Sequence, residues 1–226
     1  MNQNVKPAII SSIFEIILTH PLDVFKTKNQ QSTLTLKKFI FEKNLKYKYR
    51  GLLSRSVGLL PMRTIFWASQ DIAEKNIKHV NTKLYYKSLF VGLTSSFCQT
   101  LIDTPIENIK ISKINKQNFN INLKSLYLGF NIHWARNAIF TTTLYSLNKF
   151  SIENEYNIFI SGALGGMLGS LISQPIDYIK TNIQSNNNIS LNKYHLKNCM
   201  NGAIPRSAMG LISMGIGSSI YYFFKN

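Results

Sequence analysis

The sequence predicts an all-α membrane protein whose six transmembrane helices form three αα repeats. A short pattern that combines a proline, an acid and a base occurs three times at long intervals. Small residues precede each copy at the same two offsets, and each copy is followed by a polar stretch and then a second apolar run. Because self-similarity at a long interval indicates a repeat architecture, it decides the fold class before single elements are assigned.

The repeated pattern is P-x-[DE]-x-x-[KR], and its copies begin at Pro21, Pro105 and Pro175. The prolines are 84 and 70 residues apart, which leaves room for two helices and a connection in each unit. The composition of the chain predicts only about 0.03 chance copies of the pattern. A proline inside a helix removes a hydrogen bond and clashes with the carbonyl four residues earlier, so we expect a kink in the first helix of each repeat.

The first helix of each repeat carries small residues thirteen and nine positions before its proline. This small-xxx-small spacing lets membrane helices approach each other closely. The spacing is also compatible with helix packing in any helical protein, but its matching offset in all three copies favours a repeated helix contact. The six positions are Ala8, Ser12, Gly92, Ser96, Gly162 and Gly166.

The second helix of each repeat is an apolar run that follows a glycine. Glycine permits close backbone approach, and the N-terminus of a helix attracts anions such as lipid phosphate. The runs cover residues 52–76, 130–150 and 202–224, after Gly51, Gly129 and Gly202. The polar connection of the first repeat could hold a short amphipathic helix at residues 33–44. The repeats then cover residues 1–80, 81–152 and 153–226, within a single transmembrane domain.

The composition favours an anionic partner. The 226 residues carry a formal net charge of +16, which is typical of proteins that bind nucleic acid, anionic lipid or anionic solutes. No stretch of twenty residues is purely apolar, so no simple single-pass anchor is evident. The N-terminus lacks the features of a secretory signal or of an Arg-rich transit peptide. Cys98 and Cys199 lie far apart, are expected to be free thiols and have no metal-binding spacing.

Motifs of enzymes and of nucleic-acid-binding modules are missing. The chain contains no G-x-G-x-x-G, P-loop, H-E-x-x-H or G-x-S-x-G sequence, so we expect neither an enzyme nor a cofactor. Its lysines lie between apolar runs instead of forming one basic stripe, which argues against a nucleic-acid partner. Extraction from membranes distinguishes these classes, because a membrane-spanning protein needs detergent, whereas an enzyme or a nucleic-acid-binding module should stay soluble.

The three copies of the motif in register, the element Tyr49-Arg50-Gly51 and the small residues make the sequence similar to the mitochondrial carriers. The resemblance covers essentially the whole chain, with shorter loops than in most carriers. It implies a threefold pseudosymmetric barrel of six tilted helices around a water-filled cavity. Ionisable residues inside membrane helices must face a cavity or a partner, which agrees with that layout. The sequence uses Lys, Asn and Ile heavily, which indicates A+T-rich coding. This bias and the short loops also resemble carriers held by large DNA viruses or intracellular parasites.

The resemblance implies a gate on the matrix side, in which each repeated acid pairs with the base of the next repeat. The expected pairs are Asp23 with Lys110, Glu107 with Lys180, and Asp177 with Lys26. A glutamine brace is implied beneath the network at Gln30 and Gln184, whereas the second repeat has Ile114 there. Ordinary surface salt bridges, worth about 0–1 kcal/mol each, are the alternative interpretation, and the triplication argues against it.

The resemblance also implies a cytoplasmic gate near the ends of the second helices. Carriers usually place an acid there and a base three residues later. Asp71 fits the acid, but Glu74 stands where the base is expected. The other repeats offer Lys149, Tyr222 and Lys225. A complete network of three pairs cannot be drawn from these residues, so we expect a weaker gate on this side.

The resemblance places the substrate near mid-membrane, on the second helices. Alignment of the three apolar runs by their first glycines gives the contact positions Gly58, Arg136 and Met209. Asn137 lies beside Arg136, whose guanidinium offers a planar fork of donors for a carboxylate or a phosphate. An interhelical hydrogen bond of Arg136 is the structural alternative. Further positive charge in the cavity is expected from Arg63, His133, Arg55 and Arg206.

The excess of cationic groups predicts an anionic substrate. The RRRMMM element that marks ADP/ATP carriers is absent, so strict ADP/ATP exchange is not expected. Room at Gly58 and the aromatic residues Phe66, Trp134 and Phe140 favour a nucleotide or deoxynucleotide. An arginine followed by a small polar residue instead resembles carriers of carboxylic or keto acids. Nucleotide exchange by alternating access is the first hypothesis, with a carboxylate carrier and a non-transporting adaptor as alternatives.

The expected location is the mitochondrial inner membrane, as a multi-pass protein, in the mitochondrion of the host if the gene is viral. The expected partners are an anionic small molecule and membrane lipid. Basic residues near the matrix ends of the helices, including Lys124 and Lys197, favour cardiolipin. Nothing in the sequence demands more than a monomer.

Overall fold

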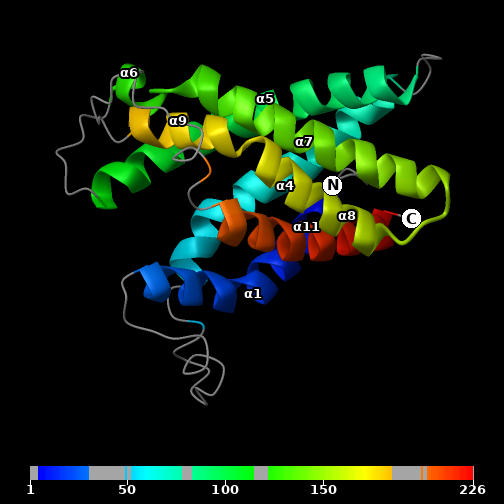
Figure 1. Cartoon of the computed structure of the whole chain (residues 1–226), viewed down its shortest axis with the longest axis horizontal. Coiled ribbons are helices and arrows are strands. Elements are labelled where there is room, and N and C mark those ends of the chain that lie inside the picture. Colours follow the sequence, from blue (N-terminus) through cyan, green and yellow to red (C-terminus); the bar gives the residue numbers. More distant parts are fainter. Residues whose placement is uncertain are drawn as a thin grey trace.

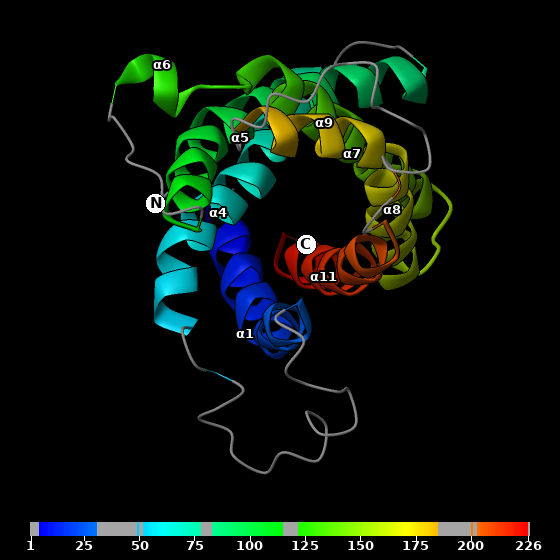
Figure 2. The same ribbon diagram turned by 60° about the vertical axis from the view of Figure 1, so that its left-hand side comes forward.

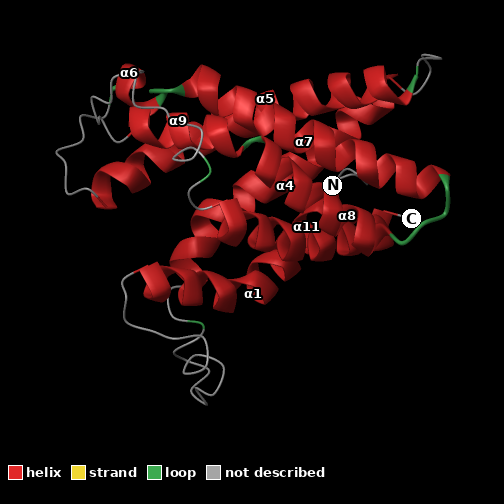
Figure 3. Ribbon diagram, in the orientation of Figure 1, coloured by secondary structure: helices red, strands yellow, loops and turns green. Residues whose placement is uncertain are grey.

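The computed structural model describes residues 5–30, 49, 52–77, 83–114, 122–184, 200 and 203–225, and their regular structure is entirely helical (Figure 1, Figure 3). The predicted all-α class therefore agrees with the described part of the chain. The helices of the first half are α1 (Val5–Gln30), α4 (Leu52–Ile77) and α5 (Leu84–Ile114). Those of the second half are α6 (Leu123–Leu126), α7 (Phe130–Glu153), α8 (Ile158–Ile172), α9 (Gln174–Gln184) and α11 (Ala203–Lys225). The short helix predicted at residues 33–44 lies outside the described residues.

The helices contact one another in a closed order. α1 contacts α4, α4 contacts α5, and α5 contacts α7. α7 then contacts α8 and α9, and α11 packs against α8 and closes on α1. Figure 2 shows the helices arranged in this order around a common centre. The first and last helices are therefore neighbours, although they lie at opposite ends of the sequence.

The proline of the third repeat divides the first helix of that repeat. α8 ends at Ile172, α9 begins at Gln174 directly before Pro175, and the two segments are bent by 54°. In the described residues, no helix taken singly has the length and apolar composition of a membrane span, whereas this bent pair has both. α1 and α5 continue as single helices through Pro21 and Pro105. The first helix of the third repeat therefore divides at its proline, whereas the first helices of the other two repeats continue past theirs.

α8 and α11 cross closely at glycines. A Cβ added to Gly166 would lie 2.7 Å from Cβ of Met214 and closer still to the carbonyl oxygen of Gly210. A Cβ added to Gly162 would lie 2.6 Å from the carbonyl oxygen of Met214. Real Cβ atoms do not approach other atoms so closely, so these positions require glycine. The close helix contact predicted from Gly162 and Gly166 is confirmed at this crossing.

Adding one methyl group at the crossing is expected to separate the two helices. Gly166→Ala should lower the free energy of unfolding by about 1.5 kcal/mol, because the new Cβ overlaps backbone atoms of α11. Gly58→Ala is the matched control, since its Cβ would meet only Cγ2 of Ile106 at the ordinary distance of 3.8 Å. The control should leave stability unchanged or raise it by up to about 1 kcal/mol through helix propensity. Unfolding of the purified variants in detergent measures both, and equal destabilisation would contradict the crossing.

Buried polar side chains also join helices. The amide of Asn148 on α7 donates to the hydroxyl of Ser218 on α11 at 2.9 Å. The hydroxyl of Ser161 on α8 donates to the amide oxygen of Asn148 at 3.1 Å. All three residues are buried, so each polar group is compensated by a partner when it leaves water. These bonds tie α7, α8 and α11 together beside the glycine crossing.

The first helix of each repeat exposes large apolar side chains at helical spacing. In α5 they are Phe90, Leu93, Phe97 and Leu101, in α8 they are Ile160, Leu164, Leu168 and Ile172, and in α1 they are Ile13, Phe14, Ile17 and Leu18. The same helices bury small polar residues, such as Ser95 and Thr100 of α5. Contiguous exposed apolar surface marks contact with a membrane or another protein. The outer faces of these helices are therefore apolar and parts of their inner faces polar.

Candidate functional site

Seven ionisable side chains gather where α5, α7, α9 and α11 meet, and we call them the α7 cluster. Its members are Asp103, Glu107, His133, Arg136, Asp177, Lys180 and Arg206. A second group, the end cluster, joins the C-terminal parts of α4, α7 and α11. Its members are Asp71, Glu74, Lys75, Lys149 and Lys225.

Two arginines from different helices hold one carboxylate in the α7 cluster. Nε of Arg136 on α7 lies 3.0 Å from Oδ1 of Asp177, and Nη1 of Arg206 on α11 lies 3.1 Å from Oδ2. Arg206 also donates to Gln174 at 2.9 Å and to Ser173 at 3.0 Å. Guanidinium groups are strong, directional partners for carboxylates. The pair is thus a carboxylate-binding arrangement, occupied here by a side chain of the protein.

The matrix pair predicted between Glu107 and Lys180 forms in the structure, and the Lys180 side chain is buried. Asp177 contacts Arg136 and Arg206, two partners that the sequence did not predict. The remaining predicted members of the matrix gate lie in helical segments whose side chains are outside the described residues. They are Asp23, Lys26, Gln30, Lys110 and Gln184. The pairs Asp23–Lys110 and Asp177–Lys26 therefore stay predictions.

His133 is fully buried among acidic groups of α5. Its Nε2 atom lies 3.1 Å from a carboxylate oxygen of Asp103 and 3.4 Å from one of Glu107. Its Nδ1 atom lies 3.0 Å from the hydroxyl oxygen of Thr104. The donor atoms of Asp103, Glu107 and His133 lie within 4.8 Å of one another, a spacing at which such groups can hold a metal ion. The ammonium of Lys180 already binds the Glu107 carboxylate, and this positive charge disfavours a cation there.

The predicted contact residue Arg63 is paired with an acid of another helix. Its Nη2 atom lies 2.9 Å from the carboxylate of Glu15 on α1 and donates to Ser213 on α11 at 3.2 Å. Ser213 in turn donates to Glu15, which is 2% exposed. Arg63 therefore lies at a polar junction of three helices, and a free anion would have to compete with Glu15 for it.

The other predicted substrate contacts occupy different environments. Asn137 is buried, donates to Thr100 at 2.9 Å and accepts from Nη1 of Arg136 at 2.5 Å, so it orients Arg136. Gly58 and Met209 are half-buried on α4 and α11. The Arg55 side chain lies outside the described residues.

The end cluster joins all three second helices. Glu74 of α4 binds Lys149 of α7 at 2.8 Å and Lys225 of α11 at 3.3 Å. Asp71 of α4 binds Lys225 at 2.6 Å and Lys75 at 3.2 Å. Glu74 stands where the carrier pattern has a base, and we expected it to leave the network incomplete. The structure instead uses it as a second acid that binds two lysines.

Tyrosines of α11 line the end cluster. The ammonium of Lys225 lies 5.6 Å from the ring centres of Tyr221 and Tyr222, within the range of a cation–π contact. Tyr221 stacks on Trp67 of α4 with ring centres 4.8 Å apart. Tyr222, which the sequence offered for the cytoplasmic gate, therefore contacts its lysine through the ring face. The stacked rings of Trp67 and Tyr221 therefore lie beside the Lys225 ammonium.

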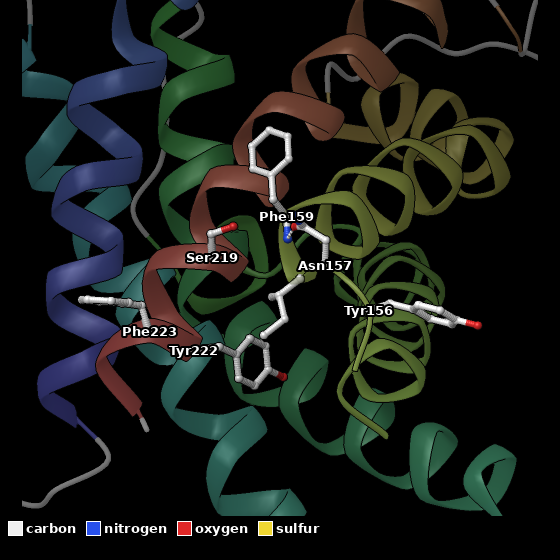
Figure 4. Close-up of a pocket in the computed structure, with 7 residues that line it drawn as sticks. Tyr156, Asn157, Phe159, Ser219, Tyr222 and Phe223 are labelled. Carbon is white, nitrogen blue, oxygen red and sulfur yellow. Dashed lines mark hydrogen bonds between the residues drawn. The ribbon is translucent and has the colours of Figure 1, made fainter. Parts of the chain in front are cut away.

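A surface pocket of about 370 Å³ lies where the loop before α8 meets the end of α11 (Figure 4). Its lining consists of Tyr156, Asn157, Ile158, Phe159, Ser219, Tyr222 and Phe223. Figure 4 shows Tyr156 and Phe223 pointing to opposite sides. No charged side chain lines this pocket, so it lacks a group that would hold an anion, and the α7 cluster remains the candidate site.

Sequence reasoning missed two buried acids, Glu15 and Asp103. Each is the single acid of its apolar run, in IFEIIL and in TLIDT. An ionisable residue within a membrane helix is a functional candidate by default, and this signal would have found both. Of the two lysines predicted to contact lipid, Lys124 is exposed on α6, and Lys197 lies outside the described residues.

The chain is similar to known carriers. The family model described as mitochondrial carrier protein matches residues 152–206. The mitochondrial 2-oxodicarboxylate carrier 2 of Saccharomyces cerevisiae is 24% identical, over 78% of this chain and 72% of the relative. A probable mitochondrial 2-oxodicarboxylate carrier of Dictyostelium discoideum is 28% identical, over 82% of this chain and 73% of the relative. A mitochondrial carrier-like protein of Acanthamoeba polyphaga mimivirus is 26% identical, over 76% and 75%.

Proposed function

Because the chain belongs to the mitochondrial carrier family of membrane transporters, we propose that it moves a dicarboxylate of the 2-oxodicarboxylate class across the inner membrane. The observation that carries this proposal is the carboxylate of Asp177 held by Arg136 and Arg206. A site that binds one carboxylate through two guanidinium groups fits a carboxylic acid substrate.

The relatives support the carboxylate alternative over the nucleotide hypothesis. Four of the similar proteins, from two yeasts and Dictyostelium discoideum, are named as 2-oxodicarboxylate carriers or probable ones. The aromatic residues that suggested a nucleobase have other neighbours. Phe66 is fully buried in the apolar core, and the Trp134 indole donates to Ser96 at 3.1 Å. The nucleotide hypothesis thus loses support from two of the three aromatic residues on which it was based.

The proposed architecture is a barrel of three pseudosymmetric repeats, at residues 1–80, 81–152 and 153–226. The closed order of helix contacts supports it, as do the apolar outer faces of α1, α5 and α8. In a bilayer these faces would contact acyl chains, and the charged clusters would line a water-filled interior. Lys124, exposed on α6, is the candidate contact for a cardiolipin headgroup.

The proposed mechanism starts with competition for the two arginines. A substrate carboxylate would bind Arg136 and Arg206 and displace Asp177. The displaced Asp177 would then depend on the predicted pairing with Lys26 in the matrix gate. The second carboxylate of the substrate has a candidate partner in Arg63, in competition with Glu15. Substrate would thereby favour one gate state over the other, which is the condition for a ligand to drive alternating access.

Uptake by proteoliposomes tests the proposed function. Vesicles containing purified protein and unlabelled 2-oxoglutarate should take up labelled 2-oxoglutarate. Parallel vesicles loaded with ADP or dATP should not take up the labelled nucleotide. Nucleotide exchange without dicarboxylate exchange would overturn the substrate proposal and keep the carrier function. Folded protein that transports neither class would instead indicate an adaptor.

A further inference from the structure

Exposed aromatic side chains gather at the end of the molecule that holds the end cluster. They stand at the starts of α5 and α8, at the ends of α7 and α11, and in the loop between α7 and α8. Figure 1 shows these segments together at its right-hand side, opposite α6. We call the set the aromatic belt, and its members are Tyr85, Tyr86, Phe150, Tyr156, Phe159, Phe223 and Phe224. The other exposed aromatic residues of the described part of the chain are Phe14, Phe90, Phe97 and Tyr127.

The rings of the belt lie at the surface and contact one another. Their exposed fraction runs from 46% for Phe159 to 78% for Phe223. Tyr85 lies against Tyr86 with ring centres 5.4 Å apart, and the ring centres of Phe150 and Tyr156 are 6.0 Å apart. Single exposed apolar residues are normal on any protein surface, whereas grouped ones mark contact with a partner. Large rings exposed at one end of several helices therefore indicate a contact surface.

The exposed side chains on the two sides of the belt differ in kind. Toward the loops, Lys83, Glu153 and Glu155 are charged. Toward the middle of the molecule, α8 exposes the aliphatic side chains Ile160, Leu164, Leu168 and Ile172. Charged, aromatic and aliphatic layers in this order are typical of a membrane boundary, because tyrosine and tryptophan favour the headgroup level and aliphatic side chains the hydrocarbon.

α7 has the length that separates the two boundaries of a bilayer. Phe150 belongs to the belt, and Phe130 begins α7 twenty residues earlier. The ring of Phe130 contacts Tyr127, with centres 5.9 Å apart. At about 1.5 Å per residue, the two phenylalanines of α7 lie about 30 Å apart along the helix axis, which is the thickness of the hydrocarbon core. The rings thus mark a membrane span in a helix that is too polar to be recognised by its mean hydropathy.

A bilayer fits the belt better than a protein partner does. Three members are tyrosines, whose apolar ring and polar hydroxyl suit a surface that is apolar on one side and wet on the other. The charged residues beyond the belt carry both signs, so their charge does not indicate an acidic or a basic partner. The belt also continues into the apolar outer faces of α5 and α8, in a chain that belongs to a family of membrane transporters.

We propose that the aromatic belt lies in the headgroup layer of one leaflet and fixes the depth of the carrier in the bilayer. The inference rests on the membrane architecture of the proposed function and does not depend on the substrate. The end cluster then lies at the level of the headgroups. Arg136 precedes Phe150 by fourteen residues of α7, which places the α7 cluster about 21 Å below the belt. A substrate that enters from this end would cross about two thirds of the hydrocarbon layer inside the protein before it meets the arginines.

Nitroxide labels measure the depth of the belt directly. Single cysteines replace Glu153, Phe159 and Leu168 in a full-length protein that also carries Cys98→Ser and Cys199→Ser. Each labelled protein is reconstituted in phosphatidylcholine vesicles. Collisions of the label with oxygen, which collects in the hydrocarbon, are compared with collisions with a water-soluble nickel chelate. The ratio of oxygen to nickel collisions should rise from Glu153→Cys to Phe159→Cys and again to Leu168→Cys, which lies about 13 Å further along α8.

The combined substitutions Tyr85→Ser, Tyr86→Ser and Tyr156→Ser test whether the belt sets the depth. Serine favours water, so the membrane boundary should move toward the aliphatic face of α8 by about 5 Å, one helical turn. A label at Ile160→Cys should then collide with the nickel chelate more often than the same label in a protein with the three tyrosines. Phe14→Ser is the control, because it removes an exposed ring of α1 outside the belt and should leave the collisions at Ile160→Cys unchanged.

A label at Leu168→Cys that meets the nickel chelate as often as the label at Glu153→Cys overturns the bilayer assignment. A label at Phe159→Cys that is screened from both reagents also overturns it, since a second copy of the chain would then cover the belt. If Phe159→Cys does not fold, Phe223→Cys takes its place, because Phe223 is the most exposed ring of the belt. An unchanged depth after loss of the three tyrosines overturns the role of the belt in setting it.

The labels report on the belt whether or not the protein transports. Uptake of 2-oxoglutarate by a carrier whose label at Leu168→Cys lies in water overturns the belt and keeps the proposed substrate. The expected depth profile in a protein that takes up no 2-oxoglutarate keeps the belt and overturns the substrate. The two proposals therefore fail separately.

Discussion

Arg136→Ala is expected to slow dicarboxylate exchange by about 100-fold. The variant loses the guanidinium that the substrate carboxylate would take over from Asp177. Hydrogen bonds to charged groups contribute about 1.5–3 kcal/mol, and two bonds from one planar group account for a change of about 2.7 kcal/mol, which corresponds to 100-fold in rate. Initial rates of labelled 2-oxoglutarate uptake measure the effect. Arg136→Lys keeps the charge without the fork and should fall between the variant and the wild type.

A double variant separates the substrate role of Arg136 from its structural role. Arg136→Ala leaves the half-buried Asp177 with one arginine fewer, so it should also unfold more readily. Adding Asp177→Asn removes that unpaired charge and should restore much of the lost stability. Transport should not recover, because the substrate still lacks its guanidinium. Recovery of transport together with stability would mean that Arg136 only holds α7 to α9.

Glu74→Lys is expected to lower the free energy of unfolding by about 3 kcal/mol. The substitution breaks the ion pairs with Lys149 and Lys225 and places a third ammonium beside them. The side chains involved are only 22–27% exposed, so water compensates the loss poorly. For a chain of this size, the midpoint of thermal unfolding should fall by about 6–12 °C. The same variant should leak substrate if this cluster closes one end of the carrier.

Lys75→Gln, one residue further along α4, is the matched control for Glu74→Lys. Its ammonium lies 3.2 Å from Asp71, but the side chain is 54% exposed. Exposed ion pairs contribute little, so the change in unfolding free energy should stay below about 0.5 kcal/mol. A Glu74→Lys protein as stable as this control would show that the end cluster does not hold the three helices together.

The second helices could be placed from the sequence because their signals are local. The apolar run at residues 52–76 corresponds to α4 (Leu52–Ile77), and the run at 130–150 begins where α7 begins. Gly129 directly before α7 has φ 74°, the left-handed conformation that suits glycine. The division at Pro175 could not be placed in this way, since α1 and α5 continue through equivalent prolines. Arg206 binds Ser173 and Gln174 at this break, and such a contact between distant segments is not visible in a local pattern.

The residues of the candidate site could be predicted better than their partners. Motif spacing identified Glu107, Lys180 and Asp177, and the alignment of glycines identified Arg136. Asp177 contacts Arg136 and Arg206, which no motif indicated, and its predicted pairing with Lys26 stays a prediction because the Lys26 side chain lies outside the described residues. A carrier alternates between states, and one motif does not determine which state places which charges in contact. Charge type is a property of the residue, whereas pairing depends on the positions of whole helices.

The charges of the end cluster are unevenly distributed over its helices, and this affects how the C-terminal ends of α4, α7 and α11 separate. Both of its acids belong to α4, and α7 and α11 contribute only lysines. Ion pairing between α7 and α11 at this end therefore passes through α4, whereas their direct contact is the neutral hydrogen bond from Asn148 to Ser218. Once α4 withdraws, Lys149 and Lys225 repel each other, so losing one contact weakens the rest. This end is built to release cooperatively in a single event, and a symmetric ring of three independent pairs would instead release in steps.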